Sequence, residues 1–204
     1  MIYVIARSYD EIKYDHEGFK VIINTSTDDI RADIAAWPQI YEDAKRNGYK
    51  YVGIYQARRA FHIDDKVMHE NEFDTSTADV FVTKFECTTM LEQYQRSHPE
   101  FKDVLEKVVP NEYLEHVNDD YLYPHNMFYV DFSTFEKIYH FIMKMCDEID
   151  ALHLQTKDKI ASYVSERAIS LWFMKNFSEE KIHVCRCLRF NKETGIIDAR
   201  ENGL

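Results

Sequence analysis

Two adjacent arginines, Arg58 and Arg59, lie near the end of an apolar run that reads YVGIYQARRAF over residues 51–61. A guanidinium group at the end of a buried strand is costly unless an anion meets it, and its planar donors match phosphate and carboxylate oxygens. The pair therefore indicates a phosphate or carboxylate site. The alternative is that one arginine pairs with a structural Asp or Glu while the other lies in water.

Further polar residues flank two other apolar runs, residues 2–6 and 127–130. In α/β sheets, ligands bind in the loops at the carboxyl ends of the strands, so residues in such loops are candidates for binding. The candidates are Arg7, Ser8 and Tyr9 after the first run, and His125 and Asn126 before the second.

One carboxylate, Glu166, lies within a helical pattern over residues 158–176 whose apolar positions indicate a mostly buried helix. A carboxylate that is kept partly dry has a raised pKa and is suited to act as a general base. The alternative is that Glu166 forms a salt bridge with Arg167 or with a lysine.

Metal and nucleotide motifs are sparse. The sequence contains no GxGxxG, GxxxxGK[ST], HExxH or GxSxG motif, which excludes the common dinucleotide, P-loop, zincin and serine-hydrolase patterns. Only residues 62–65 bring a histidine and carboxylates close together along the sequence. If the protein uses a divalent cation such as Mn²⁺ or Mg²⁺, Asp64 and Asp65 are the reserve candidates for its ligands.

The elements that must position these residues alternate between strands and helices. Period-two and apolar runs predict strands at residues 2–6, 19–23, 51–55, 80–82, 127–130 and 182–190. Helical spacing predicts helices at residues 28–47, capped by Ser26 or Thr27; at 88–109, broken near 97–99; at 134–152, capped by Ser133; and at 158–176. Residues 62–77 are expected to form a long loop. The pattern predicts an α/β fold with a helical insertion over about 88–110.

Size and charge limit the possible classes. At 204 residues and 24.4 kDa the chain fits a single domain over residues 1–204. A net charge of -11 disfavours non-specific binding to nucleic acid or anionic lipid. No apolar run reaches the roughly 18 to 20 residues that span a bilayer. We therefore expect a cytoplasmic protein without membrane insertion.

Four segments, in this order, resemble a known family. They are YVGIYQARRAF (51–61), MLEQYQRSH (90–98), HNMFYVDFSTFEKIYHFIMKMCDEID (125–150) and YVSERAISLWFMKN (163–176). Together they resemble a family of bacterial glycosyltransferases from capsule and exopolysaccharide clusters, long labelled only as a domain of unknown function. That family has a strand ending in His-Tyr-Arg-Arg-Tyr-Phe, a Tyr-Asp-Gln-Tyr-Lys-His-type helix, an Asn-Met-Phe strand and a Phe-Leu-Ser-Glu-Arg-Leu helix.

The resemblance implies a GT-A-like fold, a mixed and mostly parallel sheet flanked by helices. It also implies transfer of a sugar from a nucleotide-sugar donor, first of all a UDP-sugar, to a hydroxyl group of a glycan or a small molecule. The positions that match the family motifs are Arg58, Arg59, Tyr94, His98, Asn126, Met127, Ser165, Glu166 and Arg167.

Departures from the family pattern fall around the arginine pair. Gln56 and Ala57 stand where the family has His and Tyr, and Ala60 stands where it has the following Tyr. Many GT-A enzymes hold a divalent ion there through Asp-x-Asp. We expect the two arginines to compensate the leaving diphosphate without an obligatory metal, and Glu166 to act as the base of an inverting transfer.

Two alternatives remain open. The first is a bacteriophage-type transferase that acts on a hydroxylated or hydroxymethylated pyrimidine in DNA, in the cytoplasm of the host, and a cluster of Lys45, Arg46 and Lys50 near the arginine pair would support it. The second is a module that binds a nucleotide sugar without catalysis, supported by the departures at Gln56, Ala57 and Ala60.

Overall fold

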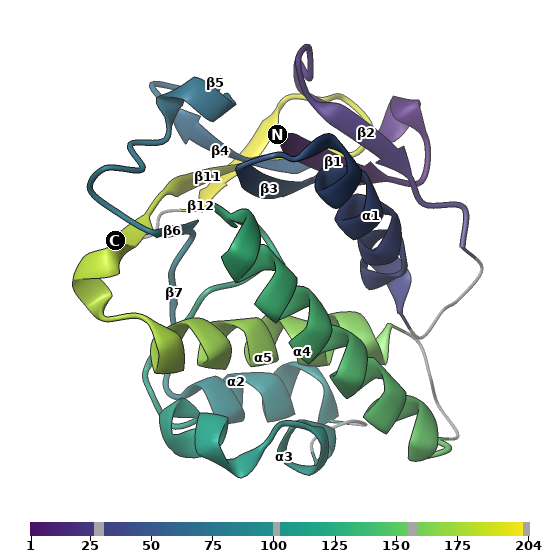
Figure 1. Ribbon diagram of the computed structural model, residues 1–204, viewed down its shortest axis with the longest axis vertical. Helices are drawn as coiled ribbons and strands as arrows, with labels where there is room; N and C mark the ends of the chain where they lie inside the picture. Colours follow the sequence, from purple (N-terminus) through teal and green to yellow (C-terminus); the bar gives the residue numbers. More distant parts are fainter. Residues whose placement is uncertain (27–30, 100–102, 155–158, 202–204) are drawn as a thin grey trace.

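The computed structural model describes residues 1–26, 31–99, 103–154 and 159–201. Ten strands form one mixed sheet (Figure 1): β1 (Ile2–Ala6), β2 (Lys20–Ile23), β3 (Tyr51–Gln56), β4 (Arg59–Ile63), β5 (Lys66–Val67), β6 (Val80–Val82), β9 (Phe128–Asp131), β10 (Ile182–Val184), β11 (Arg186–Phe190) and β12 (Ile197–Glu201). A separate pair consists of β7 (Phe85–Glu86) and β8 (Tyr121–Leu122). The helices are α1 (Trp37–Asn47), α2 (Met90–Ser97), α3 (Val104–Val108), α4 (Phe132–Ala151) and α5 (Ile160–Asn176).

The main path of the sheet runs β10-β6-β9-β3-β4-β11-β12, with β1 beside β3, β2 beside β1 and β5 beside β4. β1 is parallel to both β2 and β3, and β6 is parallel to β10. Because β9 is antiparallel to both β3 and β6, these two strands point the same way. Among the described strands of this sheet, only β4, β9 and β12 run opposite to β1. Each of them pairs with strands of the other direction, so most hydrogen-bonded strand pairs are antiparallel. The expected class, a mixed sheet with mostly parallel strand directions flanked by helices, is confirmed.

The sheet separates two hydrophobic cores. Along β1, Tyr3 and Ile5 belong to a core shared with α1, α4 and α5, whereas Ile2 and Val4 belong to a second core on the opposite face. Figure 1 shows α1 and α4 lying across one face of the sheet, with α5 and the shorter helices next to them. All five β1 residues are buried, as expected for a strand that is covered on both faces.

Gly53 of β3 allows the second core to close. A Cβ atom at this position would lie 2.9 Å from Cδ2 of Tyr129 and 3.0 Å from Cγ1 of Ile2. The Tyr129 ring is itself stacked on Phe73 with 4.1 Å between ring centroids. The close approach of the neighbouring side chains therefore requires a residue without a side chain.

The helix starts differ from those expected. Thr27, Asp28 and the rest of residues 27–30 lie outside the described residues; the described part is a 3₁₀ turn at Ala32–Ala36 that leads into α1. Pro38 falls in the first turn of α1, where a missing N–H is tolerated. Gly48, with φ of 63°, ends this helix as expected.

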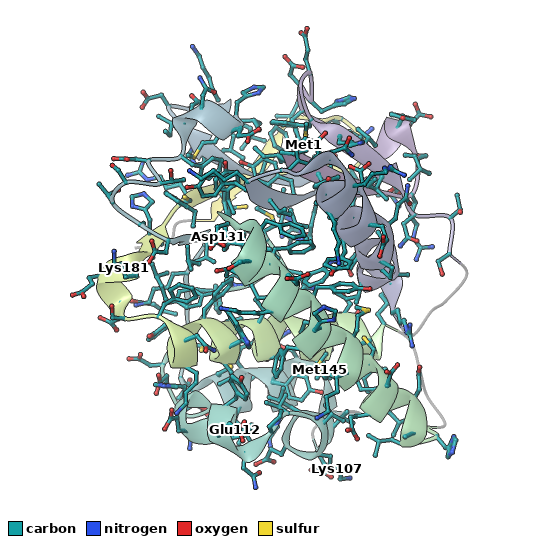
Figure 2. All side chains as sticks on the ribbon, viewed as in Figure 1. Met1, Lys107, Glu112, Asp131, Met145 and Lys181 are labelled. Atoms are coloured by element: carbon teal, nitrogen blue, oxygen red, sulfur yellow. The ribbon has the colours of Figure 1, made fainter. Side chains whose placement is uncertain are left out.

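The cap of α4 is Asp131 and not Ser133. Its Oδ1 atom accepts hydrogen bonds from the backbone N–H groups of Ser133 at 2.9 Å and Thr134 at 3.1 Å. Asp131, labelled in Figure 2, thus ends β9 and begins α4 with no loop between them. The insertion expected over 88–110 contains α2 and α3, and Lys107 and Glu112 mark this end of the molecule in Figure 2.

Residues 62–77 are not one long loop. β4 continues to Ile63 and forms a hairpin with β5, in which Asp64 and Asp65 make the turn with φ of 49° and 63°. His62 is a buried polar residue, and this concealed the strand in a sequence reading based on apolar period. The last predicted strand is likewise two, β10 and β11, which pair with different parts of the sheet.

Candidate active site

A cleft of about 810 Å³ lies at the edge of the sheet where β1, β2 and β3 end. Ala6 at the end of β1, Asn24 after β2 and Gln56 at the end of β3 line it. The opposite wall is the start of α5, with Ser162 and Tyr163. The carboxyl edge of parallel strands is where α/β sheets bind ligands.

The cleft gathers positive charge in an acidic protein. Its cationic lining residues are Arg7, Arg58, Arg59, Lys159 and Lys192, and its acidic ones are Glu11 and Asp33. The whole chain has a net charge of -11. A concentration of cations in one concave site of such a protein favours an anionic ligand.

The two arginines are held by a tight turn between β3 and β4. Gln56 pairs with Arg59, which leaves Ala57 and Arg58 as the turn. The turn backbone is fixed because Ala57 N donates to Ile5 O at 3.1 Å and Phe190 N donates to Arg58 O at 2.9 Å. Both arginines line the cleft, and Arg58 forms no ion pair with a carboxylate of the described residues.

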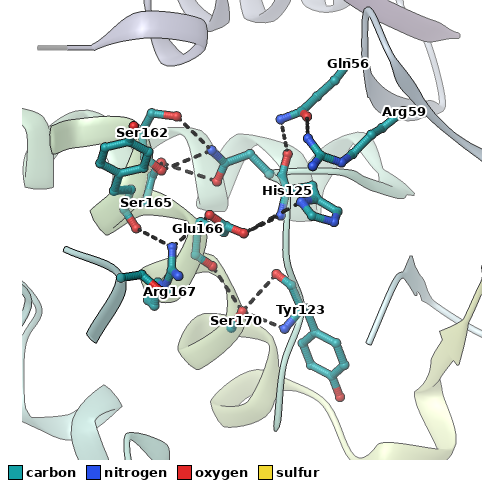
Figure 3. Close-up of polar contacts among 12 residues, drawn as sticks. Gln56, Arg59, Tyr123, His125, Ser162, Ser165, Glu166, Arg167 and Ser170 are labelled. Carbon is teal, nitrogen blue, oxygen red and sulfur yellow. Dashed lines mark hydrogen bonds and ion pairs between the residues drawn. The ribbon is translucent and has the colours of Figure 1, made fainter. Parts of the chain in front are cut away.

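Gln56 connects three parts of the site, and Figure 3 shows its bonds to two of them, Arg59 and His125. Its Oε1 atom accepts from Arg59 Nη1 at 3.2 Å, while its Nε2 atom donates to the carbonyl oxygen of His125 at 2.5 Å and lies 3.4 Å from Asp33 Oδ2. Its amide ties the arginine turn to the loop before β9 and to the far wall of the cleft.

The first turn of α5 is fixed to the same loop. The Ser162 hydroxyl donates to Asp33 Oδ1, and Asn126 Nδ2 donates to Ser162 O at 3.2 Å. Ser165 Oγ donates to Asn126 Oδ1 at 3.3 Å. His125 and Asn126 both have positive φ, 78° and 53°, so this loop has an uncommon backbone conformation held by several side chains.

Glu166 holds the loop before β9 through a hydrogen bond to its backbone. Its Oε1 atom accepts from the backbone N–H of His125 at 2.8 Å, and its Oε2 atom pairs with Arg167 Nη1 at 2.8 Å. Burial raises the pKa of Glu166, but the charges of Arg167 and His125 and the bond from His125 N outweigh it and leave the pKa below its usual value. The expected raised pKa is therefore wrong, because the salt bridge with Arg167 forms.

Asp33 has the raised pKa that the sequence suggested for Glu166. Burial raises the pKa of its carboxyl group above the ordinary value, and the nearby charge of Glu166 adds to this, against the hydrogen bond from Ser162. Asp33 lies in a 3₁₀ turn outside every motif, so no local signal in the sequence marks it. Only the fold brings it beside Gln56 and Ser162.

The middle-helix residues have different surroundings. Tyr94 is buried and does not line the cleft; the Arg167 guanidinium carbon lies 5.6 Å from its ring centroid. His98 stacks on Tyr163 with 3.8 Å between ring centroids, and Tyr163 lines the cleft. His98 therefore supports the wall of the site, and Tyr94 belongs to the core.

Of the three residues after β1, only Arg7 lines the cleft. Its backbone N–H donates to Glu11 Oε2 at 2.8 Å. Ser8 precedes a short 3₁₀ turn, and Tyr9, with 62% of its surface exposed, lies at the surface beyond the cleft.

The reserve metal ligands are not near the cleft. Asp64 and Asp65 form the turn at the end of β4 remote from Arg59. In the described ranges no three His, Cys, Asp or Glu side chains are close enough to hold a metal ion together.

The basic cluster that would support a DNA acceptor is not near the arginine pair. Lys45 Nζ donates to Tyr41 OH at 3.0 Å and Arg46 pairs with Asp43 at 3.0 Å, at the end of α1. Lys50 precedes β3, whereas the arginine pair follows it, so the cluster is at the opposite end of that strand.

Comparison with known proteins gives a fold and no family. No protein-family model and no curated protein matches the sequence. The fold is similar to a solved structure described as the bifunctional glycosyltransferase WbbM in its apo form, with a TM-score of 0.68 and 13% identity. The match covers 98% of this chain and 45% of that one, so the chain spans less than half of its neighbour's length. Among the described residues, no helix is both long enough and apolar enough to pass through a bilayer.

Proposed function

We propose that this protein is a glycosyltransferase that moves a sugar from a nucleotide-sugar donor, a UDP-sugar first of all, to the hydroxyl group of a glycan or small molecule. The carrying observation is the cationic cleft at the carboxyl edge of β1 and β3, in a fold similar to that of a glycosyltransferase. The family resemblance of the four segments adds independent support.

The arginine turn is suited to the leaving group. In an inverting transfer the acceptor oxygen attacks the anomeric carbon, the bond from that carbon to the diphosphate oxygen breaks, and the electron pair leaves with the diphosphate. Arg58 and Arg59 supply fixed positive charge where the diphosphate negative charge develops. In this proposal they do the work that a divalent ion does in many enzymes, and no metal is obligatory.

The start of α5 adds to this field. Lys159 precedes the 17-residue helix and lines the cleft. The unpaired N–H groups of a helix N-terminus carry partial positive charge and favour phosphate. The donor phosphates thus have cationic groups on two walls of the cleft.

A thermal-shift and calorimetric titration with UDP and a panel of UDP-hexoses tests the proposal. Ligands that bind the native state raise the melting temperature. Arg58→Ala is expected to weaken UDP binding about tenfold or more, because it removes a charge-assisted contact. Arg96→Ala, on the exposed part of α2, is the matched control with unchanged affinity. Equal affinity in the wild type and Arg58→Ala would reject the phosphate assignment.

The non-catalytic binding module is distinguished by turnover. Gln56 is already bonded to Arg59 and His125, so it serves a structural role where the family has His. A transferase releases UDP from a UDP-hexose slowly with water as acceptor, whereas a binding module leaves the donor intact. The DNA alternative has no comparable support, since its basic cluster lies at the opposite end of β3.

A further inference from the structure

We propose that Asp33, and not Glu166, is the general base that takes the proton of the acceptor hydroxyl. This inference rests on the glycosyltransferase function proposed above. Asp33 is one of two acidic residues that line the cleft, and the other, Glu11, is engaged with the backbone of Arg7.

The carboxylate of Asp33 is oriented from two sides. Ser162 Oγ donates to its Oδ1 atom, and Gln56 Nε2 approaches its Oδ2 atom at 3.4 Å. The Asn126 side chain and a backbone N–H also interact with this carboxylate, so several donors fix its orientation. The group is held in place but still able to accept a proton.

Gln56 also determines how the base lies relative to the leaving group. One end of its amide accepts from Arg59 at 3.2 Å and the other end faces Asp33. The proton acceptor and the guanidinium that stabilises the diphosphate are therefore separated by a single side chain. In this proposal, a sugar bound against the Gln56 side chain has the attacking hydroxyl on the Asp33 side and the departing phosphate on the arginine side.

The step balances without a further reactant. The acceptor O–H proton passes to an oxygen of Asp33, the acceptor oxygen forms a bond to the anomeric carbon, and the carbon–oxygen bond to the diphosphate breaks. The electron pair of that bond leaves with the diphosphate, which faces Arg58 and Arg59. Asp33 then returns the proton to solvent.

Glu166 is less suited to this role. Both of its oxygens are engaged, one by His125 N and the other by Arg167, and it does not line the cleft. Its lowered pKa also makes it a weaker proton acceptor at neutral pH. It acts on the site by holding the His125 loop.

The groups around Asp33 determine how the activity should depend on pH. Burial and Glu166 raise the pKa of Asp33, while Ser162 and Asn126 lower it. The other charged groups that face this cleft are Arg7, Glu11, Arg58, Arg59, Lys159 and Lys192. Because the base must be ionised, activity is expected to rise with pH through the pKa of Asp33. Replacing the Ser162 hydroxyl removes a hydrogen bond that lowers the pKa of Asp33, so the acidic limb of the pH–activity profile moves to higher pH.

The experiment compares Asp33→Asn, Ser162→Ala, Glu166→Gln and Glu180→Gln, an exposed control far from the cleft. UDP affinity is measured by calorimetry, folding by melting temperature, and turnover by UDP release from a panel of UDP-hexoses at pH 5 to 9. Asp33→Asn is expected to lose about 10²-fold or more in kcat with UDP affinity within about threefold of wild type. Ser162→Ala is expected to have the acidic limb of its pH–activity profile at higher pH than the wild type.

The outcomes separate the two proposals. Near-wild-type turnover in Asp33→Asn, or a large loss only in Glu166→Gln, overturns the role of Asp33 and leaves the transferase intact. An unmoved acidic limb in Ser162→Ala also contradicts it. Wild-type protein that binds UDP-hexoses without releasing UDP is a binding module, and wild-type protein that binds none is not a nucleotide-sugar enzyme; both overturn the base assignment together with the function.

Discussion

At the residue scale, the ion pair of Glu166 and Arg167 holds a loop next to the cleft, although neither side chain lines the cleft. The Arg167 side chain is 4% exposed, and besides Glu166 it contacts Gln93 Oε1 at 2.6 Å. Glu166 in turn holds His125 N. The pair therefore connects α2 and α5 to the loop before β9, in which the carbonyl oxygen of His125 accepts a hydrogen bond from Gln56.

Arg167→Met is expected to lower the free energy of unfolding by about 3 kcal/mol, because it leaves a buried carboxylate without its cation. Urea denaturation of the variant measures this. The double variant with Glu166→Gln should recover part of the loss, since no unpaired charge then remains. A single-variant loss below about 1 kcal/mol would show that Glu166 is adequately solvated without Arg167.

The sequence could identify some of these residues and not others. The apolar run over residues 51–55 was expected to be a strand with Arg58 and Arg59 near its end, and both arginines line the cleft where β3 ends. Asp33 was not predictable, because its chemistry depends on burial by Ser162 and Gln56, which lie 129 and 23 residues away along the chain. The pKa direction of Glu166 was missed for a different reason: its partner Arg167 is the next residue, but the sequence does not show whether burial or this salt bridge has the larger effect on the pKa.

At the element scale, most strands and helices follow their patterns, and two of the errors occur at polar residues. His62 inside β4 hid a strand, and Asp131 capped a helix whose cap was sought two residues later. β4 also pairs with β11, more than 100 residues later in the chain, and no local pattern contains that pairing.

Gly53→Ala is expected to destabilise the protein by about 1 to 3 kcal/mol, because the new Cβ atom overlaps Tyr129 and Ile2 in a packed core. The melting temperature and urea midpoint measure the change. Gly18→Ala serves as a comparison of a different kind: its Cβ meets nothing within 4 Å, but its φ of 82° disfavours alanine. If Gly53→Ala is as stable as wild type, then the Tyr129–Phe73 stack can shift freely.

At the scale of the whole molecule, three carboxylates link stability to pH. Burial raises the pKa of Asp43, Asp131 and Glu166, but hydrogen bonds and neighbouring cations such as Lys20 and Arg167 bring each pKa below its usual value. A lowered pKa in the folded state gives stability that is present above the unfolded pKa of about 4. The raised pKa of Asp33 acts in the opposite direction.

The free energy of unfolding is therefore expected to fall as pH decreases below about 4, through the folded pKa values of these three groups. Urea midpoints between pH 7 and pH 3 test this. Asp43→Asn should reduce the slope, since one of the three groups is removed. A midpoint that stays constant over the range would contradict the assigned ion pairs.

The α/β class was predictable from alternating patterns, but the strand order was not. β9 enters between β3 and β6 although it follows both along the chain, and this insertion places His125 and Asn126 beside Gln56. The location of the site depends on that crossover more than on any single motif.

Lys159 has a left-handed backbone conformation, with φ of 55°, at the residue before α5. A glycine would adopt this geometry at lower cost, yet the position presents an ammonium group to the cleft. The left-handed main chain of Lys159 thus has a conformational cost at a position that adds a positive charge to the cleft, and selection for thermal stability alone would be expected to replace this lysine.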